Sequence, residues 1–207
     1  MNSLRTMALA DLLDAFASNE PVPGGGSAAA LAGALGASLL IMVAGLPKTR
    51  TGAPEEAADL AEASARLRPL RDALLELVDD DSRAYQAVVD ATRLPKTTDA
   101  ERDGRRAAVD RAMHGATRGP LETMRCCQQA LRGAIIVATH GNRQAATDTG
   151  TAVELLAAAL RGAGMNVDVN LKGISDATFV ERVAAERAEL TADADADAAR
   201  ARDVLRT

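Results

Sequence analysis

The stretch PVPGGGSAAALAGALGASLLIMVAGLPKT, residues 21–49, constrains the fold of this chain more than any other segment. Three consecutive glycines open an uncharged run that continues to Leu46. Small residues then recur at helical spacing, at Ala29, Gly33 and Ala37 and again at Ala32 and Gly36. Such stripes let helix backbones approach closely. We therefore predict a helix from Gly25 or Gly26 to Leu46 that is central and buried on several sides.

The uncharged run is long enough to cross a bilayer, but its composition argues against a membrane span. Alanine, glycine and serine fill many of its positions, and no one-sided positive flank accompanies it, because Glu20 precedes the run and Lys48 follows it. The glycines do not form a nucleotide loop either, since no Gly-Lys-Ser/Thr follows at the required spacing and no strand precedes them. Two interpretations remain open. The turn holds a carboxylate, a phosphate or polar ring atoms at a helix start, or it only packs tightly against a neighbouring helix.

Composition predicts one all-α domain over residues 1–207, built as a long-helix bundle. Aromatic residues make up 1% of the chain, and a core of alanine, leucine and valine favours helices over sheets. The net charge of −5 and the scarcity of stacking residues argue against nucleic-acid binding. Adjacent Cys126 and Cys127 indicate reduced, buried thiols in a cytoplasmic protein without a signal peptide. Two histidines far apart predict no metal site.

Hydrophobic periodicity and capping residues predict the other helices, over residues 7–17, 55–93, 98–139, 145–163 and 176–207, with Thr98 or Asp99 capping the third and Ser175 or Asp176 the last. Pro69 is expected to kink or divide the second of these, and Gly119-Pro120 to interrupt the third. Residues 164–172 are expected to lie outside the helices. Their MNVDVNL segment alternates like a strand, but an isolated strand has no partner here.

A carboxylate in line with an apolar stripe is the sharpest chemical signal. Asp81 continues the stripe of Leu74 and Val78 towards Tyr85, whereas Asp79 is expected to point elsewhere. A charge on a core face needs an ion pair, hydrogen bonds or protonation. Asp81 is therefore either half of a buried ion pair with an arginine or an acid in a cleft.

Three further observations, on Asp148, the lysines and the asparagines, also indicate possible site residues. Asp148 aligns with the apolar side of its helix, although a carboxylate in a first turn also serves the helix dipole. The chain has 21 arginines but only three lysines, all between helices, and lysine suits proton transfer or anion binding. Asparagines lie near both ends of the Asp148 helix, where they serve as caps or bind a heterocycle; they are Asn142, Asn166 and Asn170.

Four ordered motifs resemble the folate cyclodeaminase/cyclohydrolase family. They are PVPGGGSAAALAGALGASLLIMVAGL, DDDSRAYQAVVDATRLPK, GNRQAATDTG and RGAGMNVDVNLKGISD, and the resemblance extends over nearly the whole chain. The family comprises the C-terminal domain of formimidoyltransferase-cyclodeaminase and stand-alone methenyltetrahydrofolate cyclohydrolases. The resemblance implies an all-helical fold that dimerises through long helices, with a tetrahydrofolate derivative as substrate near the glycine turn.

The implied chemistry is ring closure with loss of ammonia, or addition of water to the methenyl carbon. Either direction needs a base and an acid, and one carboxylate with one lysine suffices without metal. We expect Asp81 to be the acid/base, Lys96 its charged partner, and Asp148 a second acid or a pterin-positioning group. The expected substrate-binding residues are Gly24, Gly25, Gly26, Ser27, Asn142, Asn166 and Asn170, with Lys48 or Arg50 at the glutamate tail.

One segment departs from the family pattern. Relatives carry a Gly-Lys-Lys-Tyr-like segment after the glycine helix, where this chain reads PKTRTGAPEE. Lys48 substitutes for one of those lysines, and the tyrosine has no counterpart. Two alternatives to an active enzyme follow, a helical dimer that binds folate or another metabolite without turnover, and a purely structural partner of another helical protein.

Overall fold

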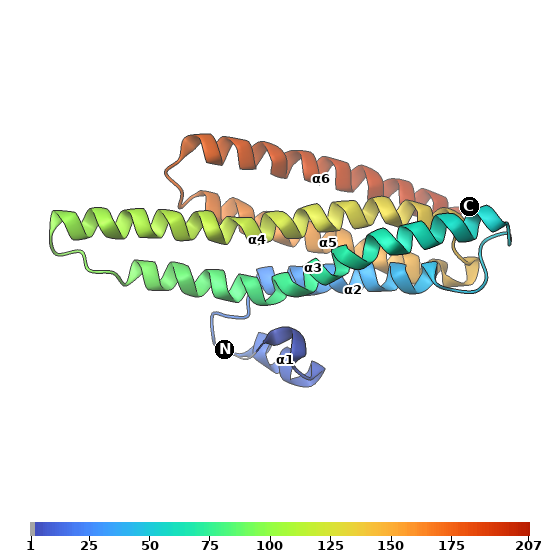
Figure 1. Cartoon of the computed structure of the whole chain (residues 1–207), viewed down its shortest axis with the longest axis horizontal. Coiled ribbons are helices and arrows are strands. Elements are labelled where there is room, and N and C mark those ends of the chain that lie inside the picture. The colour runs from blue at the N-terminus through green and yellow to red at the C-terminus, as the bar shows by residue number, and fades with distance from the viewer. Residues whose placement is uncertain (1–2) are drawn as a thin grey trace.

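Helices account for the fold, as the alanine- and leucine-rich composition predicts. The computed structural model describes residues 3–207, which form six α-helices and two short 3-10 helices (Figure 1). The α-helices are α1 (Leu9–Ala17), α2 (Gly25–Ala44), α3 (Pro54–Thr92), α4 (Asp99–His140), α5 (Ala146–Leu171) and α6 (Ala177–Arg206). The 3-10 helices are η1 (Leu4–Thr6) and η2 (Arg143–Ala145). Helices α2 to α6 pack side by side, and α1 projects from them.

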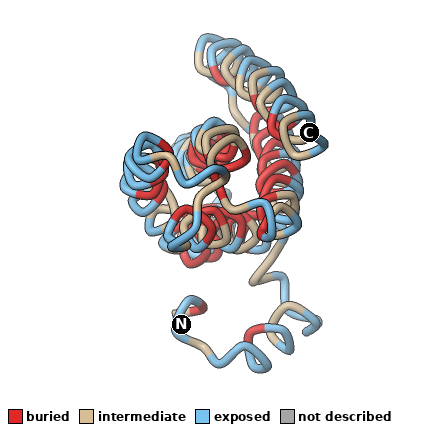
Figure 2. Tube along the Cα trace, turned by 90° about the vertical axis from the view of Figure 1, so that its right-hand side faces the viewer, coloured by how far each residue is buried: buried red, intermediate tan, exposed pale blue. Residues whose placement is uncertain are grey.

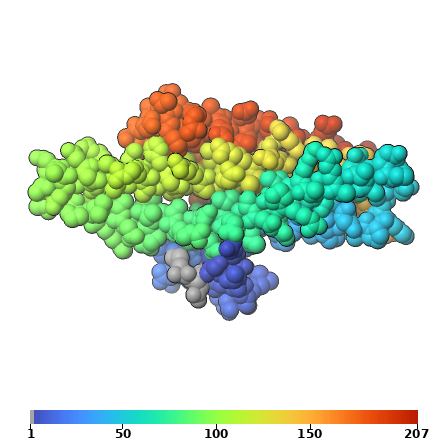
Figure 3. All heavy atoms as spheres, viewed as in Figure 1, coloured from blue at the N-terminus to red at the C-terminus, as the bar shows by residue number. Residues whose placement is uncertain are grey.

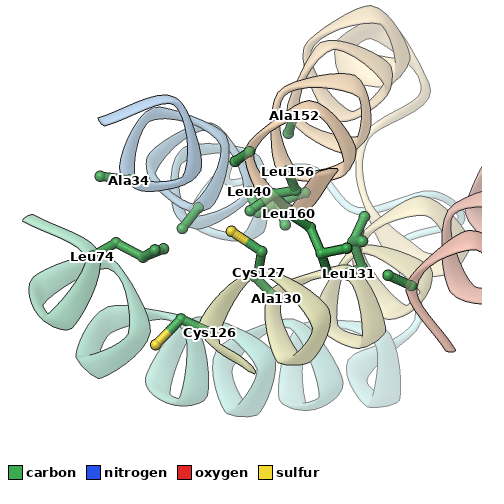
Figure 4. Packing of buried hydrophobic residues seen from close by; sticks show 14 of the residues in the cluster. Ala34, Leu40, Leu74, Cys126, Cys127, Ala130, Leu131, Ala152, Leu156 and Leu160 are labelled. Atoms are coloured by element: carbon green, nitrogen blue, oxygen red, sulfur yellow. The ribbon is translucent and has the colours of Figure 1, made fainter. Parts of the chain in front are cut away.

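The small-residue helix α2 is central, which confirms the close packing expected of it. It contacts α3, α4 and α5, and a Cβ at Gly33 would lie 2.8 Å from the Cys127 sulfur. At Gly36 a Cβ would lie 3.0 Å from the backbone oxygen of Ala152, which cannot move aside cheaply. Figure 4 shows Leu40 of α2 beside Cys127 of α4 and Leu156 of α5. Figure 2 shows buried residues concentrated between these helices.

Length and composition alone would let α2 cross a membrane. In the fold, 56% of its most apolar 18-residue window is buried inside the bundle. The apolar side chains of α2 are thus largely covered by α3, α4 and α5, as in a core helix.

The expected break at Gly119-Pro120 is wrong, because α4 runs without interruption from Asp99 to His140. Proline has no N–H, so the carbonyl of Ala116, four residues earlier, lacks its helical donor. The side-chain amide of Asn170, on α5, donates to this carbonyl at 2.9 Å. A tertiary hydrogen bond therefore replaces the missing helical one.

The expected non-helical segment at residues 164–172 is also wrong, because α5 continues to Leu171. Val167 and Leu171 are buried at helical spacing within it. Gly164 does not end the helix. A Cβ there would lie 3.5 Å from both the Met124 methyl group and Arg187 Nε, so the glycine accommodates two neighbouring helices. Tertiary packing outweighs the local preference of this segment.

Helix starts follow the predicted caps. The Thr98 hydroxyl accepts from the backbone N–H of Glu101, and the Glu101 side chain bonds back to the Thr98 N–H in a capping box. Asp176 caps α6 by accepting from the N–H of Phe179 at 3.1 Å. The α3 helix continues through Pro69 to Thr92.

Asp79 points away from the stripe that contains Asp81, as expected, and faces the N-terminal segment. This side chain is buried, because η1 lies across α3 and Asp79 accepts from the Ser3 hydroxyl and the Leu4 N–H, each at 2.6 Å. Figure 3 shows the first described residues set against the middle of the bundle. Asp79 thus anchors the N-terminal segment.

The loop between α2 and α3 is organised around one buried carboxylate. Glu56 accepts from the Thr49 hydroxyl at 2.6 Å, from the Thr51 N–H at 2.9 Å and from the Gly52 N–H at 3.2 Å. The Thr49 hydrogen bond, followed by those of the loop backbone, lowers the pKa of Glu56 from 4.5 to about 2. The charged carboxylate therefore holds the loop in place.

Stability should fall with acid in the range set by Glu56. A carboxyl whose pKa is lower in the folded chain stabilises it above the unfolded value of 4.5, and this contribution disappears as pH falls towards 2. Glu56→Gln should flatten the dependence of the free energy of unfolding on pH in this window, measured by urea denaturation. Glu55→Gln, at an exposed neighbour, should leave the slope unchanged, and equal slopes for both variants would contradict this role.

Candidate active site

The glycine turn and Asp81 meet in the structure. Gly24 is the N-cap of α2, and Oδ2 of Asp81, on α3, accepts from the Ser27 N–H at 3.0 Å. The buried Ser27 hydroxyl lies 3.2 Å from the same oxygen and 2.8 Å from the Val78 carbonyl. Within residues 3–207, no group donates a hydrogen bond to Oδ1 of Asp81. One carboxylate oxygen is thus anchored and the other is unpaired.

The close approach of Asp81 to the start of α2 requires a glycine at position 26. A Cβ at Gly26 would lie 2.1 Å from Oδ1 of Asp81, so any side chain there would displace the carboxylate. The glycines therefore do more than form a turn, because they bring a carboxylate against the start of α2, where the helix dipole and free N–H groups favour negative charge. Asp81 is half-buried and takes part in none of the salt bridges among the described residues. This argues against the buried ion pair with an arginine that the sequence left open.

Two of the three expected asparagines reach the same end of α2. A Cβ at Gly25 would lie 3.8 Å from Nδ2 of Asn166, which donates to the Gly162 carbonyl at 2.9 Å. Asn170 lies one turn further along α5 and uses its Nδ2 for Ala116. In the described part of the chain, neither side-chain oxygen receives a hydrogen bond. Both can accept from a ligand.

A groove of about 570 Å³ lies between α3, α4 and α6. It adjoins the glycine turn, because Asp81 is among its lining residues. Its volume falls within the range of small-molecule sites, about 300–1,000 Å³. Apolar atoms contribute most of its surface, and they include those of Phe179, whose ring packs against the tilted ring of His114 with 4.1 Å between centroids. Four arginines also line it, at positions 83, 118, 125 and 182.

Four other expected residues lie at the opposite end of α2, whose 20 residues span about 30 Å. Lys48 is exposed in the loop after α2, and Asp148 is half-buried in the first turn of α5. Asn142 accepts from the Gln144 N–H at 2.9 Å, which is the capping role open from sequence. The Arg50 N–H donates to the His140 carbonyl and ties the two loops together. Within one chain, these residues do not approach Asp81.

Lys96 lies in the exposed loop between α3 and α4. Residues 82–92 separate Asp81 from the end of α3, which amounts to about 16 Å of helix. Figure 1 shows this loop at one tip of the molecule. One chain alone does not make Lys96 the charged partner of Asp81, and that pairing stays a prediction.

The groove arginines were missed from sequence. Arg118, Glu122 and Arg125 share one face of α4 at helical spacing, which is visible in the sequence but typical of a solvated surface. The contribution of α6 could not be inferred, because nothing local shows which helices meet. The two cysteines are free and buried, and burial raises the pKa of the Cys126 thiol to about 12, which makes it unreactive.

Fold and site together define an all-helical protein with a ligand-sized groove and a carboxylate held at a glycine turn. The chain belongs to the formiminotransferase-cyclodeaminase family, whose model matches residues 8–189. This is a family of folate cyclodeaminase and methenyltetrahydrofolate cyclohydrolase enzymes.

Individual relatives agree with this assignment. Methenyltetrahydrofolate cyclohydrolase of Methylorubrum extorquens is 41% identical over 184 residues, covering 89% of this chain and 88% of the relative. Formimidoyltransferase-cyclodeaminase of Gallus gallus is 32% identical over 85% of this chain, which spans only 32% of that protein. The crystal structure of formiminotetrahydrofolate cyclodeaminase from Thermotoga maritima has a TM-score of 0.88 and 25% identity, with 98% of both chains covered.

Proposed function

We propose that this chain is a methenyltetrahydrofolate cyclohydrolase that works by acid–base catalysis in the cytoplasm. The observation that carries the proposal is the Asp81 carboxylate, anchored through Oδ2 at the glycine turn and unpaired at Oδ1. The extent of similarity to the Methylorubrum extorquens enzyme, over most of both chains, favours the hydrolytic reaction. The buried, unpaired cysteines suit a reducing compartment.

In this reaction water adds to the methenyl carbon and Asp81 accepts the proton of the attacking water. Cleavage of one carbon–nitrogen bond then leaves a formyl group on the other nitrogen, and the released nitrogen takes up a proton. Backbone N–H groups of Gly25 and Gly26 and the side-chain oxygens of Asn166 and Asn170 would bind the pterin. Among residues 3–207, no group of three or more histidine, cysteine, aspartate or glutamate side chains is placed to hold a metal ion.

The second candidate is formimidoyltetrahydrofolate cyclodeaminase, which the Thermotoga maritima structure favours by its coverage of both chains. Following the absorbance of methenyltetrahydrofolate separates the two. A cyclohydrolase consumes the methenyl compound, whereas a cyclodeaminase forms it from the formimidoyl compound with release of ammonia. Binding of both compounds without turnover of either would contradict both activities and favour a binding protein.

We further propose that the chain is a homodimer, with the partner packed on an uncharged surface of α2 and α5. This surface carries exposed Leu35 and Met42 on α2 and Met165 and Val169 on α5. Leu35 is 52% exposed and Met165 is 64% exposed, although both are large and apolar. A second copy that covered them would remove this apolar surface from water.

Charge at the two ends of α2 favours an antiparallel arrangement. Residues 8–24 carry three acidic side chains and no basic one, whereas residues 45–53 carry Lys48 and Arg50 and no acidic one. A two-fold axis near Leu35, midway along α2, would bring each acidic segment against a basic one. The same axis would bring Lys48 and Asp148 of the partner subunit towards the glycine turn, where they would complete the site.

Leu35→Glu should convert the dimer to a monomer, because it places a charge near the centre of the proposed contact. Sedimentation equilibrium measures the change. Leu94→Glu, at an exposed leucine on the α3–α4 loop, should leave the dimer intact.

Mixing inactive Asp81→Asn and Asp148→Asn proteins should restore activity if the two residues act across the interface. A monomeric wild-type chain would overturn the proposal.

A further inference from the structure

Two arginines in the groove between α3, α4 and α6 differ from the others that line it. Arg83 pairs with Asp80, and Arg125 pairs with Glu122 at 3.0 Å and Glu186 at 2.6 Å. Their charges are thus compensated within the chain. By contrast, Arg118 on α4 and Arg182 on α6 have no carboxylate within 4.0 Å among the described residues.

The setting of these two arginines suits an amphipathic anion. The Arg182 guanidinium carbon lies 5.1 Å from the centroid of the Phe179 ring. Phe179 is one of only three aromatic residues in the chain, and it lies in the groove. An apolar surface with one aromatic ring and two uncompensated guanidinium groups matches a flat, apolar ligand that ends in a carboxylate.

We infer that Arg118 and Arg182 bind the carboxylates of the substrate's aminobenzoyl-glutamate half, and this inference rests on the proposed function. The reacting carbon joins the pterin to the aminobenzoyl group, so the two halves of the substrate extend in opposite directions from the catalytic acid–base group. Asp81 contacts the glycine turn and also lines the groove. The pterin lies at the glycine turn beside Asn166, and the other half runs into the groove. Lys48 and Arg50, the residues expected from sequence to meet the glutamate, lie at the opposite end of α2 in the same chain.

Steady-state kinetics on the full chain test the inference. Arg118→Gln and Arg182→Gln should each raise KM for methenyltetrahydrofolate about tenfold, as expected for a lost hydrogen bond to a charged group, and leave kcat unchanged. With methenyltetrahydropteroate, which lacks the glutamate, wild type and both variants should have the same KM. Arg83→Gln is the matched control, because it removes a groove arginine that is already paired, and its KM should equal the wild-type value.

Failure of the inference is distinguishable from failure of the proposed function. If wild type turns over its substrate and the KM values of Arg118→Gln and Arg182→Gln equal that of Arg83→Gln, the inference is wrong and the function stands. If neither wild type nor any variant turns over a folate, the proposed function is wrong, and calorimetry with p-aminobenzoylglutamate tests the inference by itself. Binding to wild type that is lost in the Arg118→Gln/Arg182→Gln double variant supports the inference, and absence of binding to wild type overturns it.

Discussion

Asp81→Asn should lower kcat by about 10²- to 10⁴-fold, the usual contribution of a positioned acid–base group. Asparagine has the same shape and its side-chain oxygen still accepts from the Ser27 N–H, so the contact at the glycine turn should persist. What is lost is the ability of Oδ1 to accept a proton from the attacking water. Initial rates at saturating methenyltetrahydrofolate measure the effect.

The control for this experiment is Asp80→Asn. Asp80 is the adjacent residue, also lines the groove, and pairs with Arg83 on the surface. Its variant should keep the wild-type kcat, and both variants should unfold at the same denaturant concentration as wild type. A folded Asp81→Asn protein with full activity would remove Asp81 from the chemistry and leave the family membership unaffected.

Asn170→Ala should destabilise the fold by about 1–3 kcal/mol, the cost of leaving a buried carbonyl without its donor. That carbonyl belongs to Ala116 and lacks a helical donor because Pro120 has no N–H. In a Pro120→Ala background the restored N–H should satisfy Ala116, and Asn170→Ala should then cost much less. Urea denaturation of the four proteins gives the coupling energy as a double-mutant cycle.

Asn166→Ala provides the comparison. Its Nδ2 donates to the Gly162 carbonyl, four residues earlier on the same helix, which also has a helical N–H donor. Losing this second donor should change the free energy of unfolding less than losing the Asn170 amide. An equal cost of Asn170→Ala in the wild-type and Pro120→Ala backgrounds would show that the side chain stabilises the fold by some other contact.

The sequence predicted the parts of the fold that depend on neighbouring residues. Thr98 and Asp176 mark helix starts because their side chains cap N–H groups within three positions. The small residues of α2 predicted close packing because a missing side chain allows approach whatever the neighbour is. Both errors in helix extent, at Gly119-Pro120 and at residues 164–172, arose where a distant helix supplied what the local segment lacks.

For the site, local sequence patterns identify the candidate residues, whereas the packing of distant helices selects the ones that meet. Helical phase identified Asp81, and the glycines predicted close packing at the start of α2. In the structure the two coincide, because a Cβ at Gly26 would clash with the Asp81 carboxylate. The packing of α2, α3 and α5 brings Asp81 to the glycine turn. The same packing separates this place, within one chain, from Lys96, Lys48, Asn142 and Asp148. Periodicity gives the direction of a side chain around its own helix axis. Which helix lies opposite is set by the packing of whole faces, and that information is spread over the entire chain.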